Sequence, residues 1–212
     1  MQDQILVALI RWDLILETIA GVIALMVSHY ANRAFDLTGQ KKLSDLSSGF
    51  LVLSVAMFGR VVGTLYFFVL GAGSESLLGL VIVAYGVLKI MAYAVFAIST
   101  HRGRRSRISQ DPMPQTTMLL ALPFLLLPEL ELIAIIILMI VVFQTLLNYT
   151  SVRTRYALYV FIGFAFLLLS HLLSISAGDD VRGYVQYFAS QILQFLGLIS
   201  FMVMLRQAQK DE

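Results

Sequence analysis

The chain has 212 residues, of which 59% are hydrophobic and 13% charged, and its mean hydropathy is +0.85. Soluble domains are about 45–50% apolar and about 25% charged, so this composition excludes a water-facing globule and indicates a chain dissolved in lipid. The net charge of +2 is too small to favour a nucleic-acid partner. The lack of cysteine excludes disulfides and thiolate sites.

Six apolar runs, each long enough to cross a bilayer, follow one another along the chain. They cover 13–35, 46–70, 77–99, 130–150, 156–176 and 185–205. Runs of 21 to 25 residues reach across about 30 Å of hydrocarbon at about 1.5 Å per residue. A shorter apolar segment at 114–128 is bounded by Pro114 and Pro128 and interrupted by Pro123. It is either a short seventh helix or a re-entrant hairpin.

The basic residues between the runs predict the orientation. With seven spans and the N-terminus outside, eleven of them lie in the cytoplasm: Arg33, Lys41, Lys42, Arg102, Arg104, Arg105, Arg107, Arg153, Arg155, Arg206 and Lys210. Only Arg11 and Arg182 lie outside, whereas six spans divide the basic residues eight against five at best. The positive-inside rule therefore favours seven spans in the cell membrane, with a cytoplasmic C-terminus.

Two halves of the sequence align when the chain is shifted by 114 residues. Glu17-Thr-Ile-Ala-x-x-Ile-x-x-x-Val27 matches Glu131-Leu-Ile-Ala-x-x-Ile-x-x-x-Val141, and Gly49, Phe50 and Leu53 match Gly163, Phe164 and Leu167. These are eight identities in the 37 positions from 17 to 53, where composition alone gives about three. The alternative is coincidence, because apolar helices resemble one another.

The predicted fold class is all-α: a polytopic membrane protein of about seven transmembrane helices. Residues 1–212 form one integral membrane domain, with repeat one at 13–99, a linker helix at 114–128 and repeat two at 130–205. One intervening span gives both three-helix repeats the same orientation, with a pseudo-axis along the membrane normal. This three-one-three plan is similar to that of the SWEET sugar transporters in architecture only.

The segment from His29 to Leu53, HYANRAFDLTGQKKLSDLSSGFLVL, leaves one helix through a short basic loop and enters the next at Gly-Phe-Leu. It resembles the multi-helix membrane domains of archaeal and bacterial sensor kinases and of archaeal membrane-linked transcription regulators. The resemblance covers about 14–70 and, more faintly, 131–175. It implies a membrane module that serves signalling. Because only RQAQKDE follows residue 205, we expect the signal to pass to a separate protein.

Ionisable residues inside spans are costly to place there and therefore indicate function. We expect a ligand-binding interior cavity lined by Glu17, Arg60, Tyr85, Lys89, Tyr93, Glu131 and His171. Glu17 and Arg60 share a level on consecutive helices, which predicts an ion pair, and Glu131 with His171 repeats that pairing in the second half. The alternative is that both pairs only hold helices together.

Lys89 lies near the middle of the third span, with Tyr85 and Tyr93 four residues to either side on the same face. The seven-span arrangement places no acidic residue of another span at its level. The predicted partners of its amine are therefore tyrosine hydroxyls or an anionic ligand. A neutral lysine bonded to tyrosine or carbonyl groups is the alternative.

His29 and His171 raise the question of haem, because two histidines from different helices can ligate iron. The seven-span arrangement separates them by about 15 Å in depth, so we expect no cofactor, and no metal either. The basic cluster Arg102, Arg104, Arg105 and Arg107 predicts contact with anionic lipid headgroups. Motifs such as HExxH and GxSxG are absent, so we expect no enzyme.

Three classes of function remain. The pattern of buried ionisable residues favours a sensory or signal-input module that binds a small or lipid-like ligand and acts through a cytoplasmic partner or a homo-oligomer. A small-solute transporter that uses a cavity between the repeats is the second class. A structural or haem-binding subunit of a membrane complex is the third.

Overall fold

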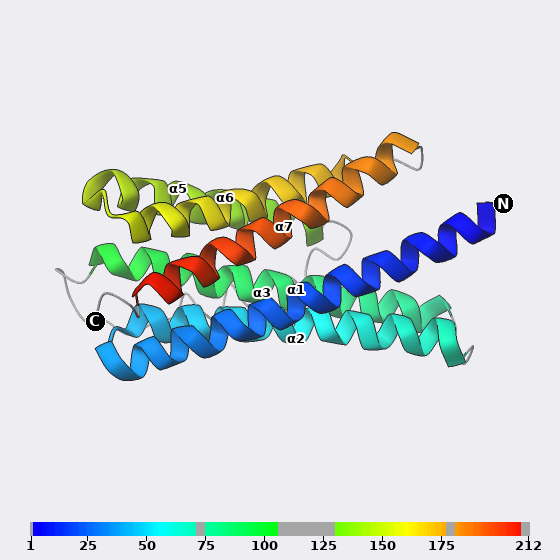
Figure 1. Ribbon diagram of the computed structural model, residues 1–212, viewed down its shortest axis with the longest axis horizontal. Helices are drawn as coiled ribbons and strands as arrows, with labels where there is room; N and C mark the ends of the chain where they lie inside the picture. The colour runs from blue at the N-terminus through cyan, green and yellow to red at the C-terminus, as the bar shows by residue number, and fades with distance from the viewer. Residues whose placement is uncertain (1, 71–74, 106–129, 177–180, 209–212) are drawn as a thin grey trace.

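The computed structural model describes residues 2–70, 75–105, 130–176 and 181–208. Within these residues the chain forms six helices: α1 (Gln2–Thr38), α2 (Lys41–Leu70), α3 (Glu75–Arg105), α5 (Leu130–Val152), α6 (Arg155–Ile175) and α7 (Val181–Ala208) (Figure 1). The all-helical class and the six predicted spans are confirmed. The predicted linker helix at 114–128 lies outside the described residues, so a seventh helix stays a prediction.

All six helices are long and apolar enough to cross a membrane. Their outward side chains are apolar: Val62, Leu80 and Phe143 are 65%, 68% and 61% exposed. The charged side chains of Glu17 and Lys89, by contrast, are buried inside the bundle. This inversion of the soluble pattern, with hydrophobic residues outside and ionisable residues inside, is what a lipid solvent selects.

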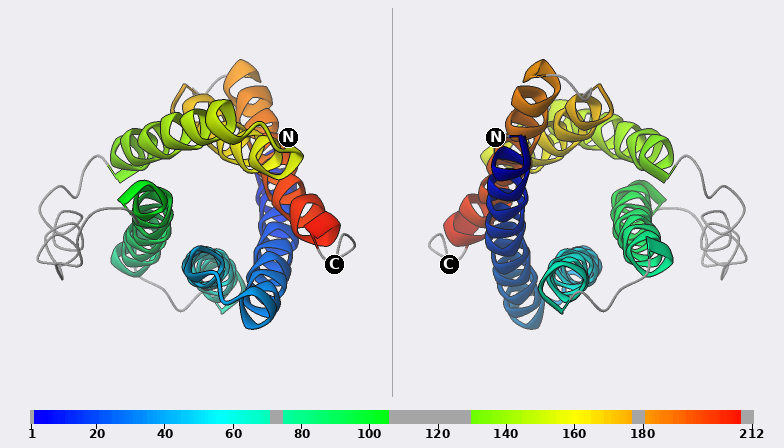
Figure 2. Two further views of the ribbon diagram at one scale, coloured as in Figure 1. Left: turned by 90° about the vertical axis from the view of Figure 1, so that its left-hand side faces the viewer. Right: turned by 90° about the vertical axis from the view of Figure 1, so that its right-hand side faces the viewer.

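The helices form a closed ring. Each helix packs against the next one along the chain, and α7 packs against α1 (Figure 2). The helices α1, α3, α5 and α7 run in one direction, and α2 and α6 run in the other (Figure 1). The contacts between α3 and α5 show that these two helices are parallel. Gly86 lies beside Leu130, and fourteen residues further along each helix Thr100 bonds to Gln144. Thus α5 begins beside Gly86, far along the bundle from Arg105, where α3 ends.

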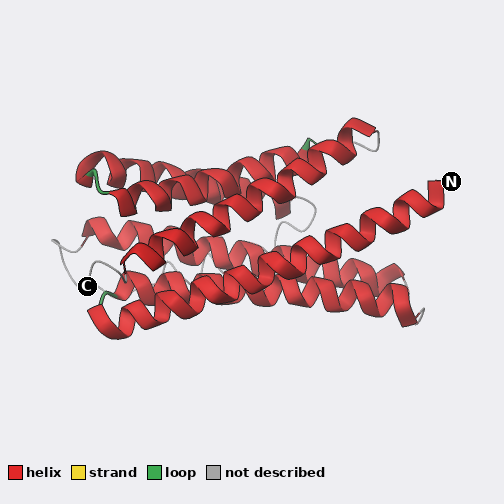
Figure 3. Ribbon diagram, in the orientation of Figure 1, coloured by secondary structure: helices red, strands yellow, loops and turns green. Residues whose placement is uncertain are grey.

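The turns after α1 and after α5 have the same backbone geometry. Gly39 and Arg153, which are 114 residues apart, have φ of 67° and 51°. Each donates its backbone N–H to the carbonyl four residues back, Gly39 to Phe35 at 2.7 Å and Arg153 to Tyr149 at 2.8 Å. Such a left-handed residue after the last helical turn closes a helix by satisfying one of its free carbonyls. Both loops lie at the same end of the bundle (Figure 3).

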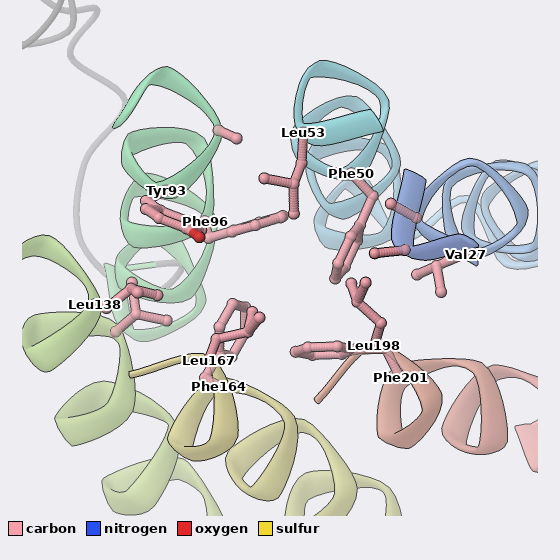
Figure 4. Close-up of a cluster of buried hydrophobic side chains, with 14 of the residues drawn as sticks. Val27, Phe50, Leu53, Tyr93, Phe96, Leu138, Phe164, Leu167, Leu198 and Phe201 are labelled. Atoms are coloured by element: carbon pink, nitrogen blue, oxygen red, sulfur yellow. The ribbon is translucent and has the colours of Figure 1, made fainter. Parts of the chain in front are cut away.

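Four phenylalanines meet in the buried core (Figure 4). The centroids of Phe50 and Phe96 are 4.8 Å apart and those of Phe164 and Phe201 are 4.7 Å apart. The cluster is closed by Phe96 against Phe164 at 5.2 Å and Phe201 against Phe50 at 4.9 Å. Because α2 and α3 supply two rings and α6 and α7 the other two, this cluster joins the two halves of the chain.

Two glycines make room for these rings. A Cβ added to Gly49 would meet the Phe96 ring, with Cδ1 only 2.7 Å away, and one added to Gly163 would meet Cε2 of Phe201 at 2.6 Å. The glycines thus let α2 approach α3 closely, and α6 approach α7. Small residues play this part at many interfaces between membrane helices.

Candidate functional site

A belt of polar and charged side chains crosses the interior of the bundle, at the level of the middle of α1 and α3 and of the first turn of α5. All six described helices contribute to it. We call it the charged belt, and its members are Asp13, Glu17, Arg60, Tyr85, Lys89, Tyr93, Glu131, His171, Tyr187 and Gln191.

Arg60 of α2 is the centre of the first part of the belt. Its guanidinium pairs with Glu17, as predicted, and donates to Oδ2 of Asp13 at 2.8 Å. The other oxygen of Asp13 accepts a hydrogen bond of 2.5 Å from the hydroxyl of Tyr187, to which Gln191 donates at 3.1 Å. These contacts fasten α2 to α1 and α1 to α7.

Glu17 is the most deeply buried carboxylate of the belt, with 1% of the residue exposed. Its Oε2 pairs with Arg60, while its Oε1 makes no full hydrogen bond among the described residues, although the Tyr85 hydroxyl interacts with the same carboxylate. An unsatisfied buried acceptor costs about 1–3 kcal/mol, and more when it is charged. Oε1 is therefore an acceptor suited to a proton or to a donor group.

Glu131 is the centre of the second part of the belt. It lies in the first turn of α5, where the helix dipole favours a negative charge. Its Oε1 bonds to Nδ1 of His171, and its Oε2 lies 3.5 Å from Nζ of Lys89. On the far side of the imidazole, Nε2 of His171 is 2.7 Å from the hydroxyl of Tyr93.

The prediction that no carboxylate of another span shares the level of Lys89 is wrong, because Glu131 lies beside it. Counting residues along each apolar run gives no information on how two helices are offset along the bundle. α3 begins at Glu75, four turns before Lys89, whereas α5 begins at Leu130, directly before Glu131. The two parallel helices are therefore staggered, which the run lengths do not reveal.

Tyr85 connects the two parts of the belt. The centre of its ring is 5.1 Å from the guanidinium carbon of Arg60 and 4.8 Å from Nζ of Lys89. Cations at this distance from an aromatic ring are attracted by its quadrupole. With this link, all seven side chains predicted to line a site form one continuous series of contacts. That they bind a ligand stays a prediction.

Asp13 and Tyr187 belong to the belt but were not singled out from the sequence. Both lie at the outer limit of an apolar run and resemble ordinary end residues. A helical signal was present, since Asp13 is four residues before Glu17 and shares its face. The contact with Tyr187 depends on α7 closing the ring against α1, and no local pattern encodes that closure.

His29 does not join the belt. It is exposed, its ring is 5.9 Å from that of Tyr30, and it follows Glu17 by more than three turns of α1. Both ring nitrogens of His171 are already hydrogen-bonded. In the described part of the chain, no group of three or more histidines, aspartates and glutamates is placed to hold a metal ion. The side chains of the predicted lipid-binding arginines, Arg102, Arg104, Arg105 and Arg107, lie outside those described.

The fold and the belt together define a helical integral membrane protein with a charged network in its interior. Comparison with protein-family models, with curated proteins and with solved structures yields no match for this chain.

Proposed function

We propose that this protein is a membrane-embedded sensory or signal-input module, which binds a small or lipid-like ligand at the charged belt and acts through a partner protein. The belt joining all six described helices carries this proposal. Charged and hydrogen-bonded side chains of the belt connect α1 to α2 and α7, α3 to α2, α5 and α6, and α5 to α6. A ligand that displaces one of these contacts would favour a different arrangement of the helices it connects. Well-packed apolar residues often replace a complete buried ion pair at little cost in stability, so a charged belt of this kind suggests a role beyond stability.

Two features indicate how a ligand would engage the belt. The side chain of Glu131 is 36% exposed, whereas those of its partners Lys89 and His171 are 9% and 3% exposed. Glu131 is thus the point where this part of the belt reaches the surface of the bundle, beside α3. Glu17 offers its Oε1 as an acceptor, because this atom makes no full hydrogen bond in the described part of the chain. A small or lipid-like molecule with hydrogen-bond donors fits both features.

The proposed topology has seven spans, with the N-terminus outside and the C-terminus in the cytoplasm. Two observations support it. The described helices α3 and α5 are parallel, so the end of α3 and the start of α5 lie at different levels of the bundle, as a span at 114–128 requires. The basic residues of the sequence favour the same arrangement.

The proposal of two parallel three-helix repeats has separate support. The turns at Gly39 and Arg153 share one geometry at a spacing of 114 residues, and Gly49 and Gly163, at the same spacing, each face a phenylalanine from the next helix. The helix directions of α1 to α3 and of α5 to α7 also agree. Many helices end in a left-handed residue, so the support comes from the equal spacing of the two turns and of the two glycines.

Transport of a small solute is the second candidate, and the equal direction of the two halves favours it. Parallel repeats about an axis along the membrane normal occur in sugar transporters of the three-one-three plan. Transporters also have helix breakers at corresponding positions of both halves. Here all four prolines lie between residues 112 and 128, which favours the sensory module.

The experiment is to purify the protein in a mild detergent and identify retained small molecules by mass spectrometry. The wild type is compared with Glu131→Gln, which removes the charge but keeps the size, and with Gly59→Ala as a control, because a Cβ at Gly59 meets open space. We expect a compound that the wild type and Gly59→Ala retain and Glu131→Gln loses about tenfold, corresponding to about 1.4 kcal/mol.

The identified compound then distinguishes the two candidates in proteoliposomes. A sensory module binds the compound without carrying it, so we expect no counterflow of labelled compound. Counterflow would establish the transporter. Equal retention by Glu131→Gln and the wild type would contradict binding at the belt.

A further inference from the structure

We propose that His171, Glu131 and Tyr93 form a proton-binding site, in which the imidazole of His171 takes up one proton as the pH falls. This site goes beyond the proposed function and does not depend on it, because its ligand is a proton and its geometry is complete without any other molecule.

The hydrogen bonds of His171 assign the neutral ring to one tautomer. Oε1 of Glu131 bonds to Nδ1, and a carboxylate only accepts, so Nδ1 carries the hydrogen. In a neutral imidazole the other nitrogen is then an acceptor, and the hydroxyl of Tyr93, 2.7 Å from Nε2, is the donor. The Nε2 nitrogen is thus the position open to a proton.

Proton uptake rearranges one hydrogen bond and leaves the other in place. The incoming proton binds Nε2, which then donates to the oxygen of Tyr93. The Tyr93 hydroxyl hydrogen turns away from the ring, while Nδ1–H continues to donate to Glu131. No other proton needs to move. The contact between α3 and α6 thereby reverses its direction of donation, which gives the protonated state a different set of contacts.

The charges that face His171 oppose one another. From α5, Glu131 favours an imidazolium, and from α3, the ammonium of Lys89 beside the same carboxylate disfavours it. On α7, the other neighbour of α6, the described titratable side chains are Tyr187, which bonds to Asp13, and Arg206, which is exposed near the end of that helix. The imidazole of His171 therefore experiences both the attraction of Glu131 and the repulsion of Lys89.

The charge of the whole belt adds a second argument. Among its described members, three carboxylates, those of Asp13, Glu17 and Glu131, face two cations, those of Arg60 and Lys89. An unbalanced charge is costly in the interior of a membrane protein. One proton on His171 makes the belt neutral overall. The competing position for that proton is Oε1 of Glu17, which makes no full hydrogen bond among the described residues.

The test is ¹⁵N NMR of the histidine-labelled full chain in nanodiscs between about pH 5 and 8, where histidines change charge. The chain has three histidines, and His29 and His101 are exposed and serve as internal controls. At pH 8 we expect His171 in the Nδ1–H tautomer, and at pH 5 as the imidazolium. An Nε2–H tautomer at pH 8, or a spectrum of His171 that is unchanged over this range, would overturn the site.

Three conservative variants assign the His171 signals and test the role of Tyr93. His29→Gln and His101→Gln, both at exposed positions, identify the His171 signals by elimination. Tyr93→Phe keeps the ring and removes the hydroxyl, so we expect the Nε2 signal of neutral His171 to shift towards that of an unbonded nitrogen. No shift would remove Tyr93 from the site.

Infrared spectroscopy tests the competing position. A protonated carboxyl C=O band that vanishes in Glu17→Gln, together with an uncharged His171 at pH 5, would place the exchangeable proton on Glu17 and refute the proposal. Because no ligand is added in any of these experiments, failure of the proton site leaves the proposed function standing, and success does not establish it.

Discussion

Arg153 holds a backbone conformation that its aligned counterpart, Gly39, adopts at no steric cost. The left-handed region costs an L-residue with a side chain about 1–2 kcal/mol. Glycine avoids this cost, but it loses more conformational entropy on folding, so the net gain from replacing arginine by glycine is smaller. Arg153→Gly should therefore raise the free energy of unfolding in detergent by about 0.5–1 kcal/mol.

The reverse change at the equivalent turn provides the control. A Cβ at Gly39 meets nothing within 4 Å, so Gly39→Ala tests the backbone conformation alone. We expect a loss of about 1 kcal/mol. If both variants unfold as the wild type does, then the shared geometry of the two turns contributes nothing to stability.

The ion pair between Glu17 and Arg60 should be strongly coupled. Arg60→Ala leaves two carboxylates, Glu17 and Asp13, without their cation and should cost about 3–5 kcal/mol. The double variant Arg60→Ala with Glu17→Gln lacks the most deeply buried of these charges. It should therefore lose less stability than Arg60→Ala alone. Thermal unfolding in detergent measures both, with Arg33→Ala at an exposed position as control. Losses that simply add would show that the charges act independently.

Residue chemistry alone was sufficient to predict the ion pair of Glu17 with Arg60. Glu17 and Arg60 are on consecutive antiparallel helices joined by a short turn, so their depths follow from counting residues. The pair of Lys89 and Glu131 was missed because these residues lie on helices separated by a long connection, where the axial offset is set by packing. Gly86 against Leu130 is one of the contacts that fix that offset, and no spacing in the sequence encodes it.

At the level of the helices, two glycines determine how closely the pairs α2–α3 and α6–α7 approach. Gly49→Ala and Gly163→Ala should each cost about 1–3 kcal/mol, because the new methyl group overlaps the ring of Phe96 or Phe201. Gly59→Ala, in the same helix as Gly49 but facing open space, should instead stabilise the protein by about 0.5–1 kcal/mol. The three variants are compared by unfolding in detergent.

A similar loss at Gly49 and Gly163 would also support the repeat, because the two positions then carry the same constraint. A loss at only one of them would indicate that the four-phenylalanine cluster is not shared equally by the halves. Equal behaviour of all three variants would show that close helix approach has no energetic role here.

The helices themselves were readily predicted, since a run of more than twenty apolar residues has few other solutions in lipid. Their ends were not: α1 begins before Asp13, and α3 continues past residue 99 to Arg105. Polar residues extend a helix beyond the hydrocarbon where backbone hydrogen bonds continue to form. Hydropathy measures the solvent preference of side chains, so it does not show where the helix continues beyond the apolar run.

For the whole molecule, the arrangement of the ends can be tested by labelling single cysteines, since the natural chain has none. Gln40→Cys and Ser151→Cys should react from the cytoplasmic side, and Ser176→Cys from the outside; all three positions are exposed. The reason is that the two loops after α1 and α5 lie at one end and the end of α6 at the other. An impermeant thiol reagent applied to intact cells and to inverted vesicles gives the sides.

Labelling of Gln40→Cys and Ser151→Cys from opposite sides would contradict the common direction of the two halves. Labelling of both from the outside would keep the repeat but reverse the predicted orientation. The closed ring itself could not be predicted from the sequence, because the packing of α7 against α1 joins residues as distant as Asp13 and Tyr187.

The four-phenylalanine cluster has a consequence for permeation. Phe164 precedes His171 by two turns of α6, about 10 Å, and it lies on the side of the loops after α1 and α5. Its ring, like those of Phe50, Phe96 and Phe201, is buried and packed against its neighbours. We therefore expect the cluster to exclude water and ions from the part of the bundle between the belt and the loops after α1 and α5. A continuous path for water or ions between the belt and the loops after α1 and α5 would have to pass these four packed rings, so we expect no leak across the bundle.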